Sequence, residues 1–499
     1  MSSPVLHGKL DDGGHKGMDV GVSSTASDTP STVSQEQLDR VKAVRRKVDV
    51  KILLWYSFVY LVMRINVSNI SNTAIMNLEQ GHGIKKQLGK LSSAQWAWVL
   101  SIFYYPYMVF EPASTLLLKR FRPRVWMSRI MITWGIISIC QAATQNYGGI
   151  LAARFFLGLA EAGFYPGVLY HLSFWYPADK MPLRIAFFYA CGQFSGTISG
   201  LLAYAISFLD GAGGLSGWRW FFIIEGIPAV LCGIYTLFFL PNYPEDSKFL
   251  DAEETQVLLD DLPKTQPSST AKTWNLSQAK ALFQDPTYIT FTLIWVFHSI
   301  GGWGVSTVLP TVIADLGLTG TAVAQLMTMP TYAFGCTCLV GIGWLIHTKK
   351  VTPWVAAITL EVIAMVCYII LISVKNTIVK YIFVTLATAC SICIYPILWP
   401  ERIRAARGTT TAGLAIGLTN AAAQFSGIVG PQVYQSKFGP TYRISYSVSL
   451  ALLAAAIASI VATWILVKKR DAQPSQHASL QDVLSSVGAT EDKVQAGHI

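Results

Sequence analysis

The feature that most constrains this chain is a series of twelve apolar stretches, each about 20 residues long. A helix of that length crosses the hydrocarbon layer of a membrane. The stretches are too long and too uniformly apolar for the alternating strands of a membrane barrel. We therefore predict an all-α membrane protein with twelve transmembrane helices. The predicted spans are 52–73, 95–118, 125–145, 148–171, 185–209, 218–241, 287–310, 323–346, 352–374, 379–399, 410–433 and 444–467.

One long polar segment, 242–286, divides the spans six from six. We predict that 49–241 forms an N-terminal six-helix bundle and that 287–470 forms a C-terminal one, with 242–286 as a central cytoplasmic loop. Residues 1–48 are polar and rich in Gly, Ser, Thr and Asp, which predicts a disordered cytoplasmic N-terminal tail. Residues 471–499 are expected to form a cytoplasmic C-terminal tail.

The distribution of charge indicates the orientation in the membrane. Only 13% of the residues are charged, whereas a soluble protein carries about a quarter. Lysine and arginine gather before the first span and in the loops after the even-numbered spans, which places both termini in the cytoplasm. Lys85, Lys86 and Lys90 in the first outer loop belong to a minority of exceptions. The net charge of +10 therefore reflects topology, and we expect a lipid bilayer rather than nucleic acid as the partner.

The chain also contains a short internal repeat. Gln193-Phe194-Ser195-Gly196 recurs 231 positions later as Gln424-Phe425-Ser426-Gly427. Both copies lie in or beside predicted spans. Two similar halves in a membrane protein are typical of transporters, whose substrate sites lie at the interface between the halves.

Cofactors, metals and catalysis are not indicated. All eight cysteines fall within predicted spans, where buried apolar cysteines are the simplest interpretation. No His or Cys cluster completes a zinc site, and there is no P-loop or nucleophile–base arrangement. We therefore predict no cofactor, no metal site and no enzymatic activity.

Charged residues inside the spans are the first candidates for function, because burying them in hydrocarbon is costly. In the fourth span, Arg154, Gly158 and Glu161 are spaced to share one helical face, and Gly158 allows a neighbouring helix to approach closely. We predict that Arg154 contacts the substrate and that Glu161 couples a proton by exchanging ion-pair partners. The alternative is a static ion pair that locks this helix to its neighbours.

Arg64 in the first span shares a face with Ser68 and Ser71 and is flanked by asparagines, among them Asn69. A guanidinium beside hydroxyls and amides suits the recognition of a carboxylate at low dielectric. We predict that Arg64 and Asn69 bind substrate. The alternative is a helix–helix hydrogen-bond network, an interpretation that applies most readily to the asparagines.

Two further ionisable residues complete the candidate set. Glu111 lies in the cytoplasmic half of the second span and is assigned to proton coupling, with a structural salt bridge as the alternative. His298 lies midway along the seventh span and is assigned to the substrate site, where it could also relay protons. The alternative is a structural histidine in an aromatic helix. Glu361 in the ninth span remains unassigned.

Three stretches resemble a known family: RFFLGLAEAGFYPG at 154–167, GWRWFFIIEG at 217–226 and FLPNYPE at 239–245. Across roughly residues 50–470 the chain resembles the major facilitator superfamily, and within it the fungal allantoate-permease-like anion:cation symporters. This resemblance implies a plasma-membrane transporter of a small organic anion, such as a vitamin, ureide or carboxylate, together with protons. The family usually has an Asp where this chain has Met63. Its absence leaves Arg64 without an adjacent counter-ion, which favours an anionic ligand there.

The expected function is therefore proton-coupled uptake of a small organic anion by a monomer, with the two bundles rocking around a central site. Efflux of a secondary metabolite is the alternative within transport. A membrane nutrient sensor that binds without transporting is the alternative from another class, although the tails are shorter than signalling segments usually are.

Overall fold

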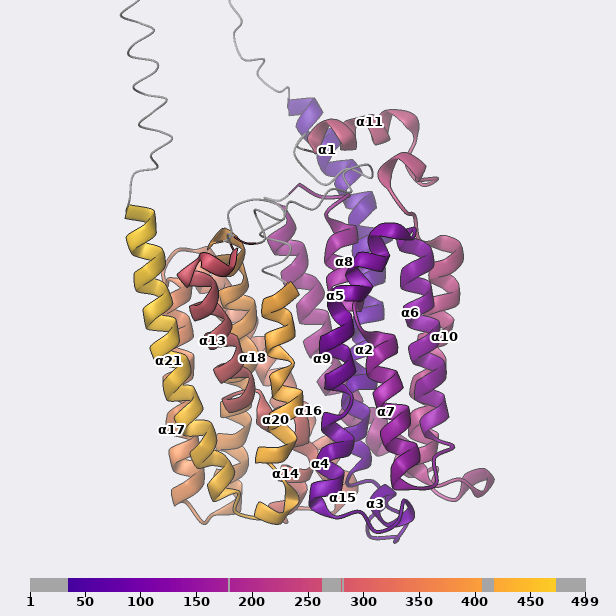
Figure 1. Cartoon of the computed structure of the whole chain (residues 1–499), viewed down its shortest axis with the longest axis vertical. Helices are drawn as coiled ribbons and strands as arrows, with labels where there is room; N and C mark the ends of the chain where they lie inside the picture. The colour runs from indigo at the N-terminus through magenta and orange to yellow at the C-terminus, as the bar shows by residue number, and fades with distance from the viewer. Residues whose placement is uncertain (1–34, 178–179, 263–279, 281, 406–416, 473–499) are drawn as a thin grey trace, which may run out of the picture.

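The computed structural model describes residues 35–177, 180–262, 280, 282–405 and 417–472, and all regular structure in these residues is helical. The helices form two bundles that lie side by side (Figure 1). The first bundle comprises η1 (Asp49–Leu53), α2 (Leu54–Thr73), α4 (Ser93–Ser101), α5 (Tyr104–Arg120), α6 (Pro123–Gln141), α7 (Tyr147–Glu161), α8 (Phe164–Leu172), α9 (Met181–Ser207) and α10 (Gly217–Phe239). The second comprises α13 (Pro286–Gly301), η4 (Gly304–Val308), α14 (Leu309–Asp315), α15 (Thr321–Leu326), α16 (Thr328–His347), α17 (Pro353–Ser373), α18 (Thr377–Ala405), α20 (Phe425–Val433) and α21 (Arg443–Ala472).

These helices make the twelve predicted crossings. Seven helical segments in the described chain are long and apolar enough to cross a membrane. The other five crossings are shorter, more polar or broken: α2, α4 with α5, α6, α7 with α8, and the helical residues 417–423 with α20. The predicted span 410–433 begins outside the described residues. The all-α, twelve-helix architecture is thus confirmed.

Helix starts follow from local sequence. The side chains of Ser92, Asn146 and Thr352 accept hydrogen bonds from the first backbone N–H groups of α4, α7 and α17, groups that have no partner within the helix. Proline occupies the first turn of α6 and of α17, where its missing N–H costs nothing. Polar caps at the ends of apolar runs therefore fix where several crossings begin.

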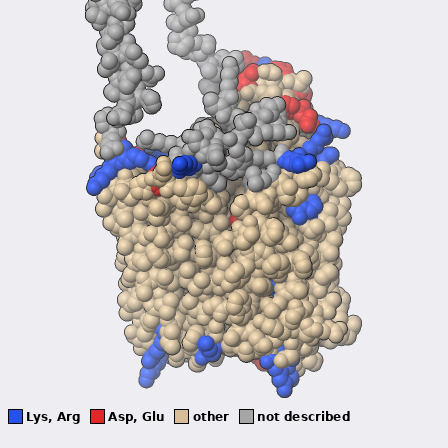
Figure 2. Space-filling model, in the orientation of Figure 1, with Lys and Arg blue, Asp and Glu red and all other residues tan. Residues whose placement is uncertain are grey.

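The two ends of the molecule differ in charge. Figure 2 shows Lys and Arg along the upper edge and at the lower tips of this face, with an almost uncharged band between them. The upper end carries α1 (Gln35–Val48) and α11 (Ala252–Asp261), and the lower end carries α3 (Ile84–Gln87) (Figure 1). We call these the α1 end and the α3 end. The uncharged band is the surface expected to face lipid.

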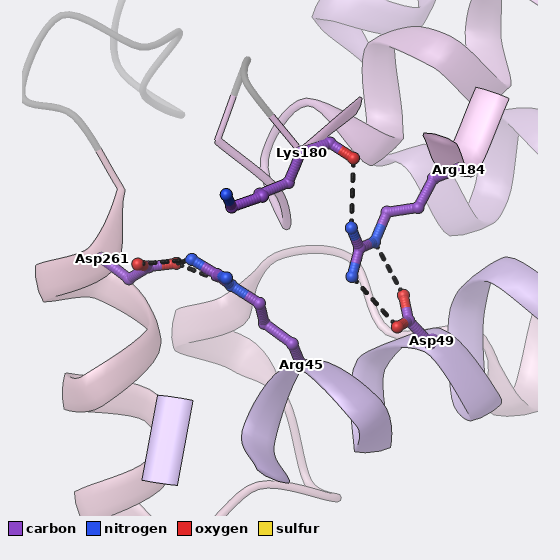
Figure 3. Close-up of polar contacts among 5 residues, drawn as sticks. All are labelled: Arg45, Asp49, Lys180, Arg184 and Asp261. Carbon is purple, nitrogen blue, oxygen red and sulfur yellow. Dashed lines mark hydrogen bonds and ion pairs between the residues drawn. The ribbon is translucent and has the colours of Figure 1, made fainter. Parts of the chain in front are cut away.

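Residues 35–48 differ from the expectation of disorder, because they form helix α1 at the start of the first crossing. Its Val44 and Val48 are buried, and α1 packs against α11. Arg45 donates to both carboxylate oxygens of Asp261 (2.6 and 2.5 Å), as Figure 3 shows. Lys47 of α1 also pairs with Glu254 of α11. Burial on one face and ion pairs on the other hold α1 in place.

A second ion pair at the α1 end joins the first and fifth crossings. Arg184, near the start of α9, donates to Asp49 through Nε (2.8 Å) and Nη2 (3.0 Å), and to the backbone oxygen of Lys180 (Figure 3). Tyr176 also donates to Asp49 (2.7 Å). These contacts tie together the α1-end tips of three crossings within one bundle.

The two bundles are joined toward the α3 end, where α9 packs on α15 and α16 and where α20 packs on α4. Hydrogen bonds that cross the interface there include Ser71 Oγ to Thr307 O (2.5 Å), Gln325 Nε2 to Asn72 O (3.2 Å), Ser101 Oγ to Ile428 O (2.8 Å) and Thr321 N to Glu79 Oε1 (3.0 Å). The conformation described here is therefore sealed between the bundles at the α3 end.

Two glycines allow the bundles to pack closely against each other. Gly196 of α9 lies against the ring of Tyr332 of α16, and Gly427 of α20 lies against the ring of Tyr104 of α5. In each case a Cβ would come within 3.0 Å of ring atoms of the other bundle. Because these glycines end the two copies of the repeated Gln-Phe-Ser-Gly motif, the motif occupies matching positions on the two halves of the interface.

Candidate functional site

A cavity of about 110 Å³ lies between the two bundles. Since one water occupies about 30 Å³ in the liquid, this space suits a small organic molecule or a few waters. Eleven of its lining residues come from the first bundle and eight from the second. Any ligand held here would therefore contact both bundles, which is the placement expected for the substrate of a rocking transporter.

Arg64 of α2 supplies the cation of the cavity wall. Its Nε is buried without a hydrogen-bond partner, and no ion pair with another described residue involves its guanidinium. The preceding residue, Met63, also lines the cavity and offers no counter-charge. A guanidinium in such a place has five N–H donors available for an anionic ligand.

Glu161 supplies the one carboxylate among the described lining residues. It ends α7, just before a break at which Gly163 adopts a φ of +89°. A Cβ on Gly163 would collide with Ser114, so glycine is required there both for conformation and for space. The break ends α7 at the point where the Glu161 side chain meets the cavity.

The predicted Arg154–Glu161 ion pair is not formed in this conformation. Arg154 is 1% exposed and lies behind the cavity wall, where its Nε donates to Val99 O (3.4 Å) and its guanidinium lies 4.9 Å from the Phe103 ring centre. No ion pair of 4.0 Å or less joins it to Glu161, although Glu161 lies within electrostatic range of both Arg154 and Arg64. The carboxylate thus lies near two arginines and is bound directly to neither.

Neutral amides complete the polar part of the wall. Gln193 and Gln424 occupy the first position of each repeated motif, and both line the cavity together with Asn420. Asn420 donates to Glu111 of the opposite bundle (2.7 Å), so Glu111 takes part in an inter-bundle hydrogen bond. Glu111 itself is 1% exposed and is not among the lining residues.

Asn69 lies away from the cavity. Its side chain is fully buried and faces Glu225 of α10, within the first bundle. Its neighbour Asn66 donates to the backbone oxygen of Glu225 (2.9 Å) and accepts from Ser138 Oγ (2.8 Å). In this conformation Asn66 therefore takes part in a helix–helix hydrogen-bond network, whereas both polar side-chain atoms of Asn69 have no hydrogen-bond partner among the described residues.

His298 lies one layer behind the wall of the second bundle. Its Nδ1 is 2.6 Å from Glu361 Oε1, and its Nε2 is 3.2 Å from the backbone oxygen of Ser391. The ring also meets that of Tyr395 edge to face at 4.9 Å. Tyr395 lines the cavity, so His298 contacts a wall residue and not the cavity space itself.

Aromatic side chains make up more than half of the wall, and the analysis of charged residues missed them. They are Tyr60, Phe103, Tyr104, Tyr107, Tyr165, Tyr189, Trp295, Trp303, Tyr395 and Trp399. Aromatic residues are spread through all the spans, so composition alone does not mark these ten. The repeated motif could have marked Gln193 and Gln424, since it places them at equivalent points of the two halves. Within the described residues, no group of three or more His, Cys, Asp and Glu could hold a metal ion.

Comparison with known proteins agrees with this architecture. Residues 56–431 match the family model described as Major Facilitator Superfamily. The MFS-type transporter cnsO of Penicillium expansum is 31% identical over 446 residues, covering 86% of this chain and 84% of that protein. An Agrobacterium vitis protein named "Putative tartrate transporter" is 30% identical over 396 residues, covering 78% of this chain and 87% of its own length.

Solved structures share the fold at low sequence identity. The D-xylose-proton symporter superposes with a TM-score of 0.63 at 14% identity, covering 83% of this chain and 97% of that one. A bacterial homolog of the human lysosomal transporter Spinster, inward-facing and unoccupied, superposes with a TM-score of 0.62 at 14% identity, covering 86% of this chain and 95% of its own.

Proposed function

We propose that this chain, which belongs to the Major Facilitator Superfamily, takes up a small organic anion together with protons. It is a multi-pass membrane transporter and not an enzyme. We further propose that the substrate is an anion and that its transport is coupled to protons. We also propose that the chain is an allantoate-permease-like symporter of the plasma membrane and works as a monomer. Finally, we propose that the α1 end faces the cytoplasm and that both termini are cytoplasmic, because Lys and Arg are more numerous in the segments at the α1 end than in those at the α3 end.

The observation that carries the proposal is the unpaired guanidinium of Arg64 between the two bundles. A charge removed from water without a partner costs several kcal/mol, by order of magnitude, so such a residue is retained for a ligand or for function. A carboxylate bound to Arg64 would satisfy it with two charge-assisted hydrogen bonds. The name of the Agrobacterium vitis relative refers to tartrate, a dicarboxylate, which supports an anionic substrate and leaves the number of carboxylates open.

Proton coupling follows from the position of Glu161 in the same wall. A bound carboxylate would add a second negative charge to a cavity that already holds the Glu161 carboxylate. Like charges in a poorly solvated site repel each other, and protonation of Glu161 removes that repulsion. The anion and the proton therefore favour each other's binding. Such reciprocal coupling means that the carrier is loaded with both together, which favours symport when only the fully loaded and the empty carrier change conformation.

The conformation agrees with such a cycle. The inter-bundle contacts lie toward the α3 end, so with the α1 end in the cytoplasm the described state is inward-facing. Glu111 and Asn420 join the bundles further along, through one hydrogen bond (2.7 Å). In this proposal Glu111 holds or releases that bond as the bundles rock, and a proton on Glu111 would alter it.

The test is uptake of a panel of radiolabelled organic acids by cells that express the chain, at an acidic and at a neutral outer pH. We expect at least one acid to accumulate, faster at acidic pH, and a protonophore to abolish the accumulation. Outward movement against the same gradient would instead indicate efflux. Binding without accumulation in either direction would indicate a sensor. Transport of neutral or cationic solutes, with no acid carried, would refute the anion assignment.

A further inference from the structure

We infer that the substrate is an aromatic monocarboxylate: a flat ring that carries a single carboxylate. This inference rests on the proposed function, and it narrows the substrate from small organic anions in general to one chemical class. Two independent properties of the cavity wall support it, namely its charge count and its aromatic surface.

The charge count limits the ligand to one carboxylate. Arg64 is the one cation among the described residues that line the cavity, and Glu161 is the one anion. Arg154 is not among the lining residues, and its guanidinium lies 4.9 Å from the ring centre of Phe103, which is one of them. A second carboxylate on the ligand would therefore lie against Glu161, neutral amides or aromatic rings, without a counter-ion. A charge that leaves water without gaining a partner opposes binding.

The aromatic surface favours a ring. On the second bundle, Trp295, Trp303, Tyr395 and Trp399 form a continuous cluster, which we call the tryptophan wall. Ring centres are 5.1 Å apart for Trp295 and Trp399, and 5.6 Å apart for Trp295 and Tyr395. All four residues line the cavity, while Arg64 lines it from the first bundle. A ligand held by Arg64 at one end would thus meet the tryptophan wall with its other end.

Buried contacts on the side away from the cavity support the tryptophan wall. The buried His298 ring packs edge to face on Tyr395, and His298 is itself fixed by Glu361 (2.6 Å) and by the Ser391 backbone (3.2 Å). Preformed aromatic surfaces stack a ligand ring in offset or edge-to-face geometry, and such contacts add to the effect of area burial alone. A saturated ring of the same size would bury similar area without these contacts.

The size of the cavity is compatible with a ligand that has a single ring. The cavity volume of about 110 Å³ is several times the space of one water and is of the same order as an apolar cavity of about 150 Å³ that binds benzene in another protein. The amides of Gln193, Gln424 and Asn420 lie in the same wall and can pair with ring heteroatoms or hydroxyl groups. An aromatic acid with polar ring substituents therefore also fits.

The test is equilibrium binding to the purified full-length chain in detergent, which avoids leakage of weak acids across membranes. The probes are benzoate, cyclohexanecarboxylate and terephthalate, which differ in ring type and in carboxylate number. We expect benzoate to bind about three- to tenfold more tightly than cyclohexanecarboxylate, the range typical of aromatic contacts. We expect terephthalate to bind at least about tenfold more weakly than benzoate, because its second charge has no partner.

A variant isolates the tryptophan wall. Trp303→Leu should bring the benzoate and cyclohexanecarboxylate affinities close together, while binding of cyclohexanecarboxylate shows that the site is still folded. Tyr395→Leu is the second variant should Trp303→Leu misfold. Trp344→Leu is the matched control, because Trp344 is 56% exposed and does not line the cavity.

The possible outcomes distinguish failure of the aromatic monocarboxylate inference from failure of the organic-anion proposal. Tighter benzoate binding that Trp303→Leu removes supports the aromatic monocarboxylate. Equal or tighter binding of cyclohexanecarboxylate or terephthalate would overturn this inference and leave the organic-anion proposal intact. Failure of all three acids to bind, together with transport of neutral solutes, would overturn both.

Discussion

Replacement of Glu361 should destabilise the second bundle by an amount that depends on whether the new side chain can still bond His298. Both side chains are buried, at 1% and 0% exposure, and the pair is 2.6 Å apart. The Ser391 carbonyl can only accept, so His298 Nε2 carries a hydrogen. At Nδ1, the hydrogen bond with Glu361 can have either partner as the donor.

Glutamine can donate its amide hydrogen to Nδ1 of a neutral His298, so Glu361→Gln should cost less than about 1 kcal/mol, the net value of a typical hydrogen bond. Glu361→Ala leaves a cavity and an unpaired ring nitrogen, and breaking a buried pair in this way costs about 3–5 kcal/mol. The double variant His298→Leu/Glu361→Leu should lie closer to the wild type, because apolar replacements of a buried pair are often neutral.

The assay is the thermal midpoint of each purified variant in one detergent, read as a ranking: wild type, Glu361→Gln, the double Leu variant, then Glu361→Ala. Uptake by Glu361→Gln at two pH values serves as the control for function. If glutamine were as damaging as alanine, the hydrogen-bond argument would fail. If glutamine kept stability but removed the pH dependence of uptake, the pair would carry the transported proton and would not serve only to hold the wall.

Three further predictions concern other parts of the molecule. Glu161→Gln should flatten the rise in uptake at acidic pH, because glutamine cannot take up a proton with the anion; an unchanged pH profile would make Glu161 structural. Gly427→Ala should lower the thermal midpoint, since the added Cβ meets the Tyr104 ring and overpacking costs about 1–3 kcal/mol; Gly341→Ala, with open space around it, is the control and should show no such change. Asp261→Asn should speed amide hydrogen exchange in α11 and reduce its sensitivity to salt, because it removes the largely buried pair with Arg45 and leaves the Lys47–Glu254 pair; exchange rates equal to those of the wild type would show that the Arg45–Asp261 pair does not hold α11.

The sequence was sufficient for the architecture because a bilayer leaves few choices. Apolar runs of membrane length determine the number of helices, and the twelve-helix fold is confirmed. The orientation drawn from the basic loops stays a prediction. The break at Gly163 and the helix at 35–48 were not predicted. The first depends on the close approach of Ser114, and the second depends on ion pairs with α11, which is distant in the sequence.

The candidate site was predicted only in part, because sequence gives the spans but not which way each face points. Arg64 and Glu161 line the cavity, whereas Arg154 and His298 lie behind its wall and Asn69 faces a different helix. A buried ionisable residue can be read from the sequence as important. Whether it meets the ligand or supports a residue that does so depends on helix rotation, which one sequence does not reveal. Their roles in binding and coupling remain predictions.

The measurement that tests the account most directly is anion binding by Arg64→Ala, compared with wild type and with Arg443→Ala, whose side chain is exposed at the α3 end. If Arg64 is the counter-ion of the ligand, its removal should weaken carboxylate binding by about 10²–10⁴-fold, from the cost of about 3–5 kcal/mol for leaving a buried charge unpaired. Arg443→Ala should bind as the wild type does. Wild-type affinity in a correctly folded Arg64→Ala protein would contradict the account.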